Sequence, residues 1–268
     1  MRIFNQTLLL FGAIVLALLG QARLAYAETA AEIMSKNFVI SKVSDSTSET
    51  TMILTNKSGK ERVRKTFGTT KLQDNGIDNM RMTRFLEPTD VRGVVSLLVE
   101  QSKKDDDIWL YLPSLKKVRR LVSSNKKDSF VGTDFSYGDV IGHKVNEWEH
   151  VIVGEEEIDG FMCHIIESTP VDETVARNTG YSKRVGWIQK DNYVSRKAEM
   201  YNLSGALYKR MQFSKIELVE PDRNKWTAKE LRAQNMITGH STVIIVDKLE
   251  VGVGVKDSFF TTRYMESE

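Results

Sequence analysis

The chain has little cysteine: Cys163 is the only one among its 268 residues. A single cysteine cannot form a disulfide within the chain, so the fold must be held by its hydrophobic core. Cys163 lies in an apolar run, where a small buried side chain is expected rather than a reactive thiol. The chain is long enough for one sizeable core or one large all-β domain.

The chain also lacks an excess of charge of either sign. Lys and Arg total 38, and Asp and Glu total 36. Two of the basic residues, Arg2 and Arg23, lie within residues 1–27, which contain no acidic residue, so the rest of the chain is balanced. A general nucleic-acid-binding protein should carry a basic excess. The composition therefore argues against nucleic acid as a partner.

The long apolar run near the N-terminus is too short for a membrane-spanning helix. Leu8–Leu19 contains 12 residues, whereas a span needs roughly 20. Arg2 precedes this run and Ala25-Tyr26-Ala27 follows it, which is the pattern of a cleavable secretory signal peptide. We predict a signal peptide over residues 1–27, cleaved after Ala27, and one exported domain over 28–268. An uncleaved anchor is the alternative, and Glu28 in place of a cysteine argues against a lipid anchor.

Signatures of catalytic and cofactor sites are missing as well. The sequence contains no G-x-S-x-G, no P-loop, no dinucleotide fingerprint and no H-E-x-x-H. Its four histidines are scattered along the chain. Cys163 and His164 are adjacent, and neighbours on a strand point to opposite faces, so they cannot easily share a metal. We therefore expect no catalytic residues, no cofactor and no metal site based on these motifs.

Three aspartates near the middle of the chain could suggest calcium. Asp128, Asp134 and Asp139 do not follow the D-x-D-x-D spacing of a calcium loop. Aspartate beside glycine is ordinary turn chemistry. The pattern favours a turn-rich loop over a calcium site.

What the chain does have is a series of short segments typical of strands, separated by turn signals. Strands are predicted at 50–54, 62–72, 80–86, 93–101, 108–112, 118–122, 149–153, 161–167, 184–189, 193–201, 207–218 and 243–247. Apolar residues at steps of three and four predict one helix over 28–38. Many short strands with regular turns indicate a mainly β fold, either a barrel or a sandwich.

The most unusual stretch is 128–141, which follows two of these strands. It places Phe130, Phe135 and Tyr137 in a loop that also holds Gly132 and Gly138. Such a loop cannot bury three rings by its own regular structure. Either the rings fill a core beneath the loop, or they close over something that the protein holds.

A basic stretch lies beside these aromatic residues. It consists of Lys116, Lys117, Arg119, Arg120, Lys126 and Lys127. One interpretation is a solvated face, because isolated surface charges carry little information. The other is a rim that attracts an anionic headgroup or the acidic surface of a partner, and in this interpretation Lys116, Lys117, Arg119 and Arg120 are the docking residues.

The central stretch resembles a known family. Tyr111–Arg120 (YLPSLKKVRR) followed by Asp128–Asp139 (DSFVGTDFSYGD) is similar to the signature of LolA-like outer-membrane lipoprotein-sorting proteins. Weaker matches follow at Glu157–Gly160 before Cys163-His164, at Trp187-Ile188 before Lys190-Asp191, at Ser204-Gly205, and at Asp257–Thr261. The resemblance extends over nearly all of residues 28–268.

The resemblance implies a fold and a function. The implied fold is a strongly curved antiparallel sheet, an incomplete barrel with helices and loops covering its mouth (α+β, mainly β). The implied function is a periplasmic carrier that holds a lipid or lipidated cargo in an apolar half-barrel cavity. It would pass this cargo from an inner-membrane exporter of the RND superfamily (MMPL type) to the outer membrane, with no enzymatic activity.

On this basis seven residues are candidates for the lipid-binding cavity or its lid: Met82, Leu97, Trp109, Tyr111, Phe130, Phe135 and Tyr137. Strand alternation cannot decide between Trp109 with Tyr111 and the other face of the same strand, because both faces are apolar. Gly132 and Gly138 would allow the loop to move.

Three other functions remain open at this stage. A related fold serves as a periplasmic stress sensor, so a lipid- or lipoprotein-sensing regulatory module is the main alternative. An enzyme acting on a lipid or envelope polymer would need an acid–base pair such as Asp134 with His143. A structural adaptor for an exporter is the third.

Overall fold

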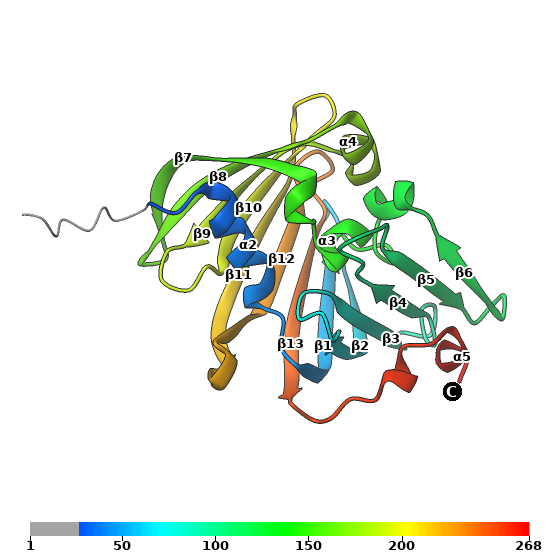
Figure 1. Cartoon of the computed structure of the whole chain (residues 1–268). Coiled ribbons are helices and arrows are strands. Elements are labelled where there is room, and N and C mark those ends of the chain that lie inside the picture. Colours follow the sequence, from blue (N-terminus) through cyan, green and yellow to red (C-terminus); the bar gives the residue numbers. More distant parts are fainter. Residues whose placement is uncertain (1–26, 268) are drawn as a thin grey trace, which may run out of the picture.

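The computed structural model describes residues 27–267, and its centre is one antiparallel sheet of 13 strands (Figure 1). The strands are β1 (Asp45–Thr55), β2 (Glu61–Leu72), β3 (Asn79–Glu87), β4 (Val95–Val99), β5 (Asp107–Leu112), β6 (Lys117–Leu121), β7 (Trp148–Ile158), β8 (Phe161–Pro170), β9 (Tyr181–Gln189), β10 (Ser195–Asn202), β11 (Leu207–Glu220), β12 (Lys225–Asn235) and β13 (Ser241–Val251). The prediction of a mainly β fold is confirmed. The predicted signal peptide, except for Ala27, lies outside the described residues.

The strand order is β6-β5-β4-β3-β2-β1-β13-β12-β11-β10-β9-β8-β7. Nearly all neighbours in the sheet are neighbours in the chain, and the exception is β1 with β13, which joins the two halves. Within the described residues, the end strands β6 and β7 do not pair with each other, so the sheet curves without closing. Figure 1 shows the sheet wrapping around its concave face. The expected incomplete barrel is therefore confirmed.

The helices are short and lie against the sheet or in its connections. They are α2 (Ala30–Ile40), α3 (Tyr137–Ile141), α4 (Glu173–Thr179) and α5 (Thr262–Met265), with 3₁₀ turns at Ser123–Lys127, Val145–Glu147, Pro221–Arg223 and Asp257–Phe259. No helix in residues 27–267 combines the length and apolarity that crossing a bilayer requires.

Helix α2 covers the concave face on the β7–β9 side. Thr29 and Glu32 form a capping box that fixes its start. Its buried side chains, including Ile33 and Met34, pack against Ile166 of β8 and Ile188 of β9. In Figure 1 the helix lies across the inner side of these strands. The helix predicted over 28–38 is therefore present, two residues further along the chain.

The aromatic loop (residues 128–142, which includes α3) covers the rest of the concave face. Phe130 and Tyr137 pack with Phe85 of β3, and the rings of Phe130 and Tyr137 meet edge to face with their centres 5.4 Å apart. Phe135 packs in a second cluster with Trp148 and other side chains of the opposite wall. The loop therefore reaches from one wall of the sheet to the other.

The convex face of β3–β6 carries a separate apolar cluster beneath the C-terminal segment. Val255, Phe260 and Met265 of that segment are buried, and Met265 has no exposed surface. They pack against Met82, Leu97, Trp109 and Tyr111 on the sheet. Both faces of these strands are therefore apolar for a structural reason: each face is covered by a different part of the chain.

Candidate ligand-binding cavity

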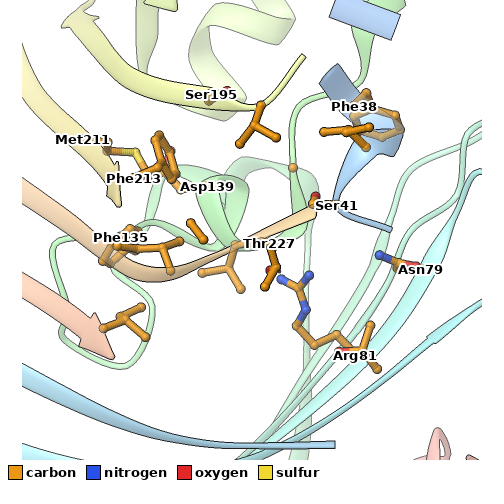
Figure 2. Close-up of a pocket in the computed structure, with 18 of the residues that line it drawn as sticks. Phe38, Ser41, Asn79, Arg81, Phe135, Asp139, Ser195, Met211, Phe213 and Thr227 are labelled. Carbon is orange, nitrogen blue, oxygen red and sulfur yellow. The ribbon is translucent and has the colours of Figure 1, made fainter. Parts of the chain in front are cut away.

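A cavity of about 470 Å³ lies between the concave face, α2 and the aromatic loop. Figure 2 shows side chains from both walls of the sheet and from α2 and α3 pointing toward it, among them Phe135, Met211 and Phe213. Known small-molecule sites have volumes of roughly 300–1,000 Å³. The cavity is therefore large enough for a ligand.

The two walls of the cavity differ in chemistry. Strands β10–β13 contribute apolar side chains: Ala198, Met200, Met211, Phe213, Leu231 and Ile244. Strands β1–β3 contribute hydroxyl groups: Ser46, Ser48, Thr50, Thr66, Thr70 and Thr83. Strand alternation produces both rows, because every second residue of each strand faces inward. The cavity therefore offers an apolar surface opposite a weakly polar one.

Polar contacts attach the aromatic loop to the sheet. Arg64 of β2 donates to the Val131 carbonyl, and Arg81 Nη1 of β3 donates to the Val140 carbonyl at 2.6 Å. Thr242 Oγ1 of β13 donates to Asp134 Oδ2 at 2.7 Å. The loop is thus held at three points along its length by side chains from β2, β3 and β13.

A buried ionic network forms the fourth attachment. Asp139 of α3 accepts from Lys209 Nζ at 2.5 Å and from the Tyr181 hydroxyl at 3.0 Å, and its side chain is only 1% exposed. Burial raises the pKa of Asp139, but Lys209 and His143 more than offset this and hold it well below its usual range. Burial lowers the pKa of Lys209, but Asp139 outweighs that effect and raises it above the usual value. Both groups are therefore charged at neutral pH.

His143 lies beside this network and is buried. Burial and the nearby charge of Arg184 together lower the pKa of His143 to about 4, although Asp139 opposes the shift. Its ring meets those of Trp148 and Tyr181 edge to face, and its Nε2 lies 3.5 Å from Asp139 Oδ1. His143 is therefore neutral at pH 7 in the folded protein.

This burial predicts a pH dependence of stability. In the unfolded chain the pKa of His143 is about 6.5. Between that pH and the folded-state pKa of about 4, the unfolded state binds a proton that the folded state excludes. The free energy of unfolding should fall as pH is lowered through this window, by about 1.4 kcal/mol per pH unit from this group. Urea unfolding of wild type and His143→Gln at pH 7, 5.5 and 4.5 should show a flatter dependence in the variant. A dependence as steep as in wild type would contradict the assignment, and His240→Gln, which replaces an exposed histidine, is the control.

The structure places the seven predicted cavity residues on two faces. Phe130 and Phe135 line the cavity, and Tyr137 packs beneath Phe130. Met82, Leu97, Trp109 and Tyr111 do not line it, because they point to the convex face and pack under the C-terminal segment. The inward residues of the 108–112 strand are Ile108, Leu110 and Leu112, which pack toward Phe130.

The basic stretch is also divided. Lys116 and Lys117 are exposed, as are Arg119 and Arg120 at the free edge of the sheet on β6, and Arg120 pairs with Asp107 at 2.5 Å. Lys126 is buried instead and pairs with Asp106 at 2.6 Å. The interpretation of the whole stretch as one exposed rim is therefore wrong for Lys126.

The two loop glycines have different roles. Gly132 has φ +78° and follows Val131, which also has a positive φ, so this turn needs glycine. Gly138 is helical, and a Cβ there would lie 3.2 Å from the Lys126 carbonyl oxygen. Gly138 therefore allows close packing against Lys126, and the movement expected at both glycines stays a prediction.

The acid–base pair considered from sequence is not formed. Asp134 bonds to Thr242, whereas His143 lies against Asp139. Cys163 is buried, as expected, and unpaired. The described residues contain no group of three or more His, Cys, Asp or Glu side chains arranged to hold a metal ion.

Sequence reasoning missed the charged residues of the cavity. Arg81 and Arg184 both line it, and Lys209 anchors α3 from β11. In the sequence these residues look like ordinary strand positions. A lysine or arginine at an inward position of an alternating strand would have been the only signal, and it requires knowing which face is inward.

Comparisons with known proteins agree with this geometry. A family model described as that of an uncharacterized protein matches residues 78–267. A search of curated proteins found no match. A solved domain from Vibrio parahaemolyticus, described as an outer-membrane lipoprotein-sorting protein, is 28% identical, with a TM-score of 0.81 over 89% of this chain and 98% of that one.

Two further solved structures identify the family and the fold of the chain. A DUF1329 family protein from Desulfovibrio piger is 30% identical, with a TM-score of 0.80 over 88% of this chain and 97% of that one. A LolA-superfamily protein from Nitrosomonas europaea is 20% identical, with a TM-score of 0.68 over 89% of this chain and all of that one, which shows the shared fold. The resemblance to LolA-like proteins is thus confirmed, and the chain belongs to the DUF1329 family, with the LolA-like fold.

Proposed function

We propose that the protein is a periplasmic carrier that holds a lipid or the acyl chains of a lipidated cargo in the concave cavity. The observation that supports this most strongly is the cavity itself, which has one apolar wall and is covered by an aromatic loop. The Vibrio relative's description as an outer-membrane lipoprotein-sorting protein supports the same class of cargo.

The physical need for such a carrier follows from the cost of exposing hydrocarbon to water. Each exposed methylene costs about 0.8 kcal/mol, so a long chain does not cross an aqueous space unaided. The cavity removes the chain from water between Phe135 and the apolar wall that includes Met211 and Leu231. A carrier must also release its cargo, and a small number of discrete polar contacts, which would have to break for the loop to open, hold it over the cavity.

The proposal also covers the direction of cargo transfer and the proteins between which the cargo passes. The carrier would receive cargo from an inner-membrane exporter of the RND superfamily (MMPL type) and deliver it to an outer-membrane acceptor, without chemical change to the cargo. Lys116, Lys117, Arg119 and Arg120 project at the free edge of the sheet, where they offer positive charge to anionic headgroups or to an acidic partner.

Transfer between vesicles tests the proposal. Donor vesicles that contain a self-quenched fluorescent phospholipid are mixed with unlabelled acceptor vesicles and the mature protein. A carrier should extract the lipid into a soluble complex and then raise fluorescence in the acceptors at a rate that grows with protein concentration. Extraction without delivery would favour a sensing module, and no extraction would overturn the proposal.

Phe135→Ala should reduce extraction of the fluorescent lipid by about tenfold. Loss of the ring would re-expose about two methylenes of a bound chain, which costs about 1.6 kcal/mol. Trp109→Ala is the matched control, because Trp109 packs on the convex face and its loss should leave extraction unchanged. Circular dichroism should show that both variants are folded. If Phe135→Ala then extracts as much lipid as wild type, the aromatic loop does not contact the bound lipid.

A further inference from the structure

Arg184 is a cavity residue whose charge is not directly paired. It lies on β9, opposite Ser168 of β8 and Met200 of β10 in the sheet register, and it lines the cavity as Met200 does. Its guanidinium carbon lies 5.1 Å from the centre of the Trp148 ring. Its Nε is buried and has no hydrogen-bond partner among residues 27–267, and no carboxylate in that range lies within 4.0 Å of it.

The carboxylate that attracts Arg184 is already bound to other groups. Asp139 attracts Arg184 through space, but its oxygens accept from Lys209, from Tyr181 and from the Ser136 backbone N–H at 2.8 Å. Lys209 alone offsets the charge of Asp139. Arg184 therefore adds a positive charge to the cavity that the described residues do not neutralise.

Arg81 approaches the cavity from the opposite wall. Figure 2 shows its side chain rising from β3 into the cavity. Within residues 27–267 its guanidinium makes one hydrogen bond, from Nη1 to the Val140 carbonyl, whereas a guanidinium has five N–H donors. Glu100, the acid that attracts Arg81, is paired with Lys42. The loop segment 139–143 thus has an arginine on either side.

Two half-buried arginines beside an apolar wall, one of them with a buried and unpartnered Nε, define a ligand class. Burying a charge is costly unless an opposite charge accompanies it. The planar guanidinium fork matches the oxygens of a carboxylate or a phosphate, and it forms strong charge-assisted hydrogen bonds with them. The side chains of Met200 and Met211 provide apolar surface in the same cavity as Arg184.

We propose that the cavity recognises an anionic amphiphile, in which Arg184 pairs with a carboxylate or phosphate group while the chain lies along the apolar wall. Arg81 adds to the positive electrostatic potential in the cavity from its other side. This inference rests on the proposed function, since it concerns the same cavity, and it adds that the cargo is selected by the negative charge of its polar end. A neutral lipid of the same chain length is a poorer ligand.

Isothermal titration with four probes tests this selection at pH 8 and constant ionic strength. The probes are dodecanoate, dodecyl phosphate, dodecanol and inorganic phosphate. Wild type should bind both anionic amphiphiles at least about tenfold more tightly than dodecanol, the factor expected for one charge-assisted contact. Arg184→Gln should abolish most of this difference, because it weakens binding of the two anionic amphiphiles far more than binding of dodecanol. Inorganic phosphate should bind much more weakly than dodecyl phosphate.

Lys183→Gln is the matched control. Lys183 is the preceding residue on the same strand, and it pairs with Glu167 at 3.0 Å outside the cavity lining. It removes the same charge and should keep the preference for anions. If Arg184→Gln fails to fold, Arg184→Lys replaces it and should retain part of the preference, because the charge remains and the fork is lost.

The outcomes separate this inference from the proposed function. Equal binding of dodecanoate, dodecyl phosphate and dodecanol would overturn the anion site and leave the apolar carrier intact. Failure of all three amphiphiles to bind would overturn both. If inorganic phosphate binds as tightly as dodecyl phosphate, the hydrocarbon chain does not contribute to binding and the ligand is not an amphiphile. If a folded Arg184→Gln keeps the full preference for anions, Arg184 is not the residue that recognises the charge.

Discussion

Lys209→Met is expected to lower the free energy of unfolding by about 3–5 kcal/mol, because it leaves Asp139 as a charged carboxylate without its cation in a buried site. The Lys209 side chain is 3% exposed and the Asp139 side chain 1%, so water cannot replace the lost partner. The same change removes the link between α3 and β11. Urea unfolding at pH 7, monitored by tryptophan fluorescence, measures the loss.

A double variant separates the pair from the packing around it. Asp139→Asn combined with Lys209→Met should recover much of the loss, since no charge then stays buried without its partner. Lys248→Met removes an exposed lysine of similar length and should change stability by no more than about 0.5 kcal/mol. A loss in Lys209→Met as small as that of the surface control would show that the network does not hold the loop.

Ser48→Trp is expected to weaken the affinity for lipid by about two orders of magnitude. Ser48 lines the cavity on β1 and lies opposite Gly68, which has no side chain to limit a larger group. An indole there would displace about four methylenes of a bound chain, at about 0.8 kcal/mol each. Extraction of the fluorescent phospholipid from vesicles measures the effect.

The adjacent residue provides the control for this variant. Glu49 is exposed and points away from the cavity on the same strand, so Glu49→Trp adds the same ring outside the site. It should extract lipid as well as wild type does. If Ser48→Trp is folded and also extracts lipid normally, the cargo lies elsewhere on the protein.

Local patterns predicted much of the sheet because its hairpins connect strands that follow one another in the chain. Turn residues such as Asp159 and Gly160, both at positive φ, mark the hairpins in sequence as they do in space. Strand β12 was not predicted. Its sequence, Lys225–Asn235, is rich in residues that favour helices, and pairing on both sides with β11 and β13 overrides that local preference.

The side of the sheet that each residue faces could not be predicted. Trp109 and Ile108 are equally apolar, and what decides between them is the C-terminal segment, which covers the convex face from more than 140 residues away in the chain. The same holds for Lys183 and Arg184. Adjacent strand residues face opposite sides of the sheet, and two basic residues in a row do not indicate which of them faces the cavity. The aromatic loop was identified because its composition is unusual for a loop, whereas its buried ionic attachments depend on the three-dimensional register of β9 and β11.

Mass spectrometry of the organic extract of the protein, purified without detergent from its native host, tests the central claim most directly. Wild type should carry a lipid or acylated molecule in near-stoichiometric amount, and Ser48→Trp purified in the same way should carry little or none. Wild-type protein free of any such molecule, or equal amounts in the two proteins, would contradict the assignment of the concave cavity as the carrier site.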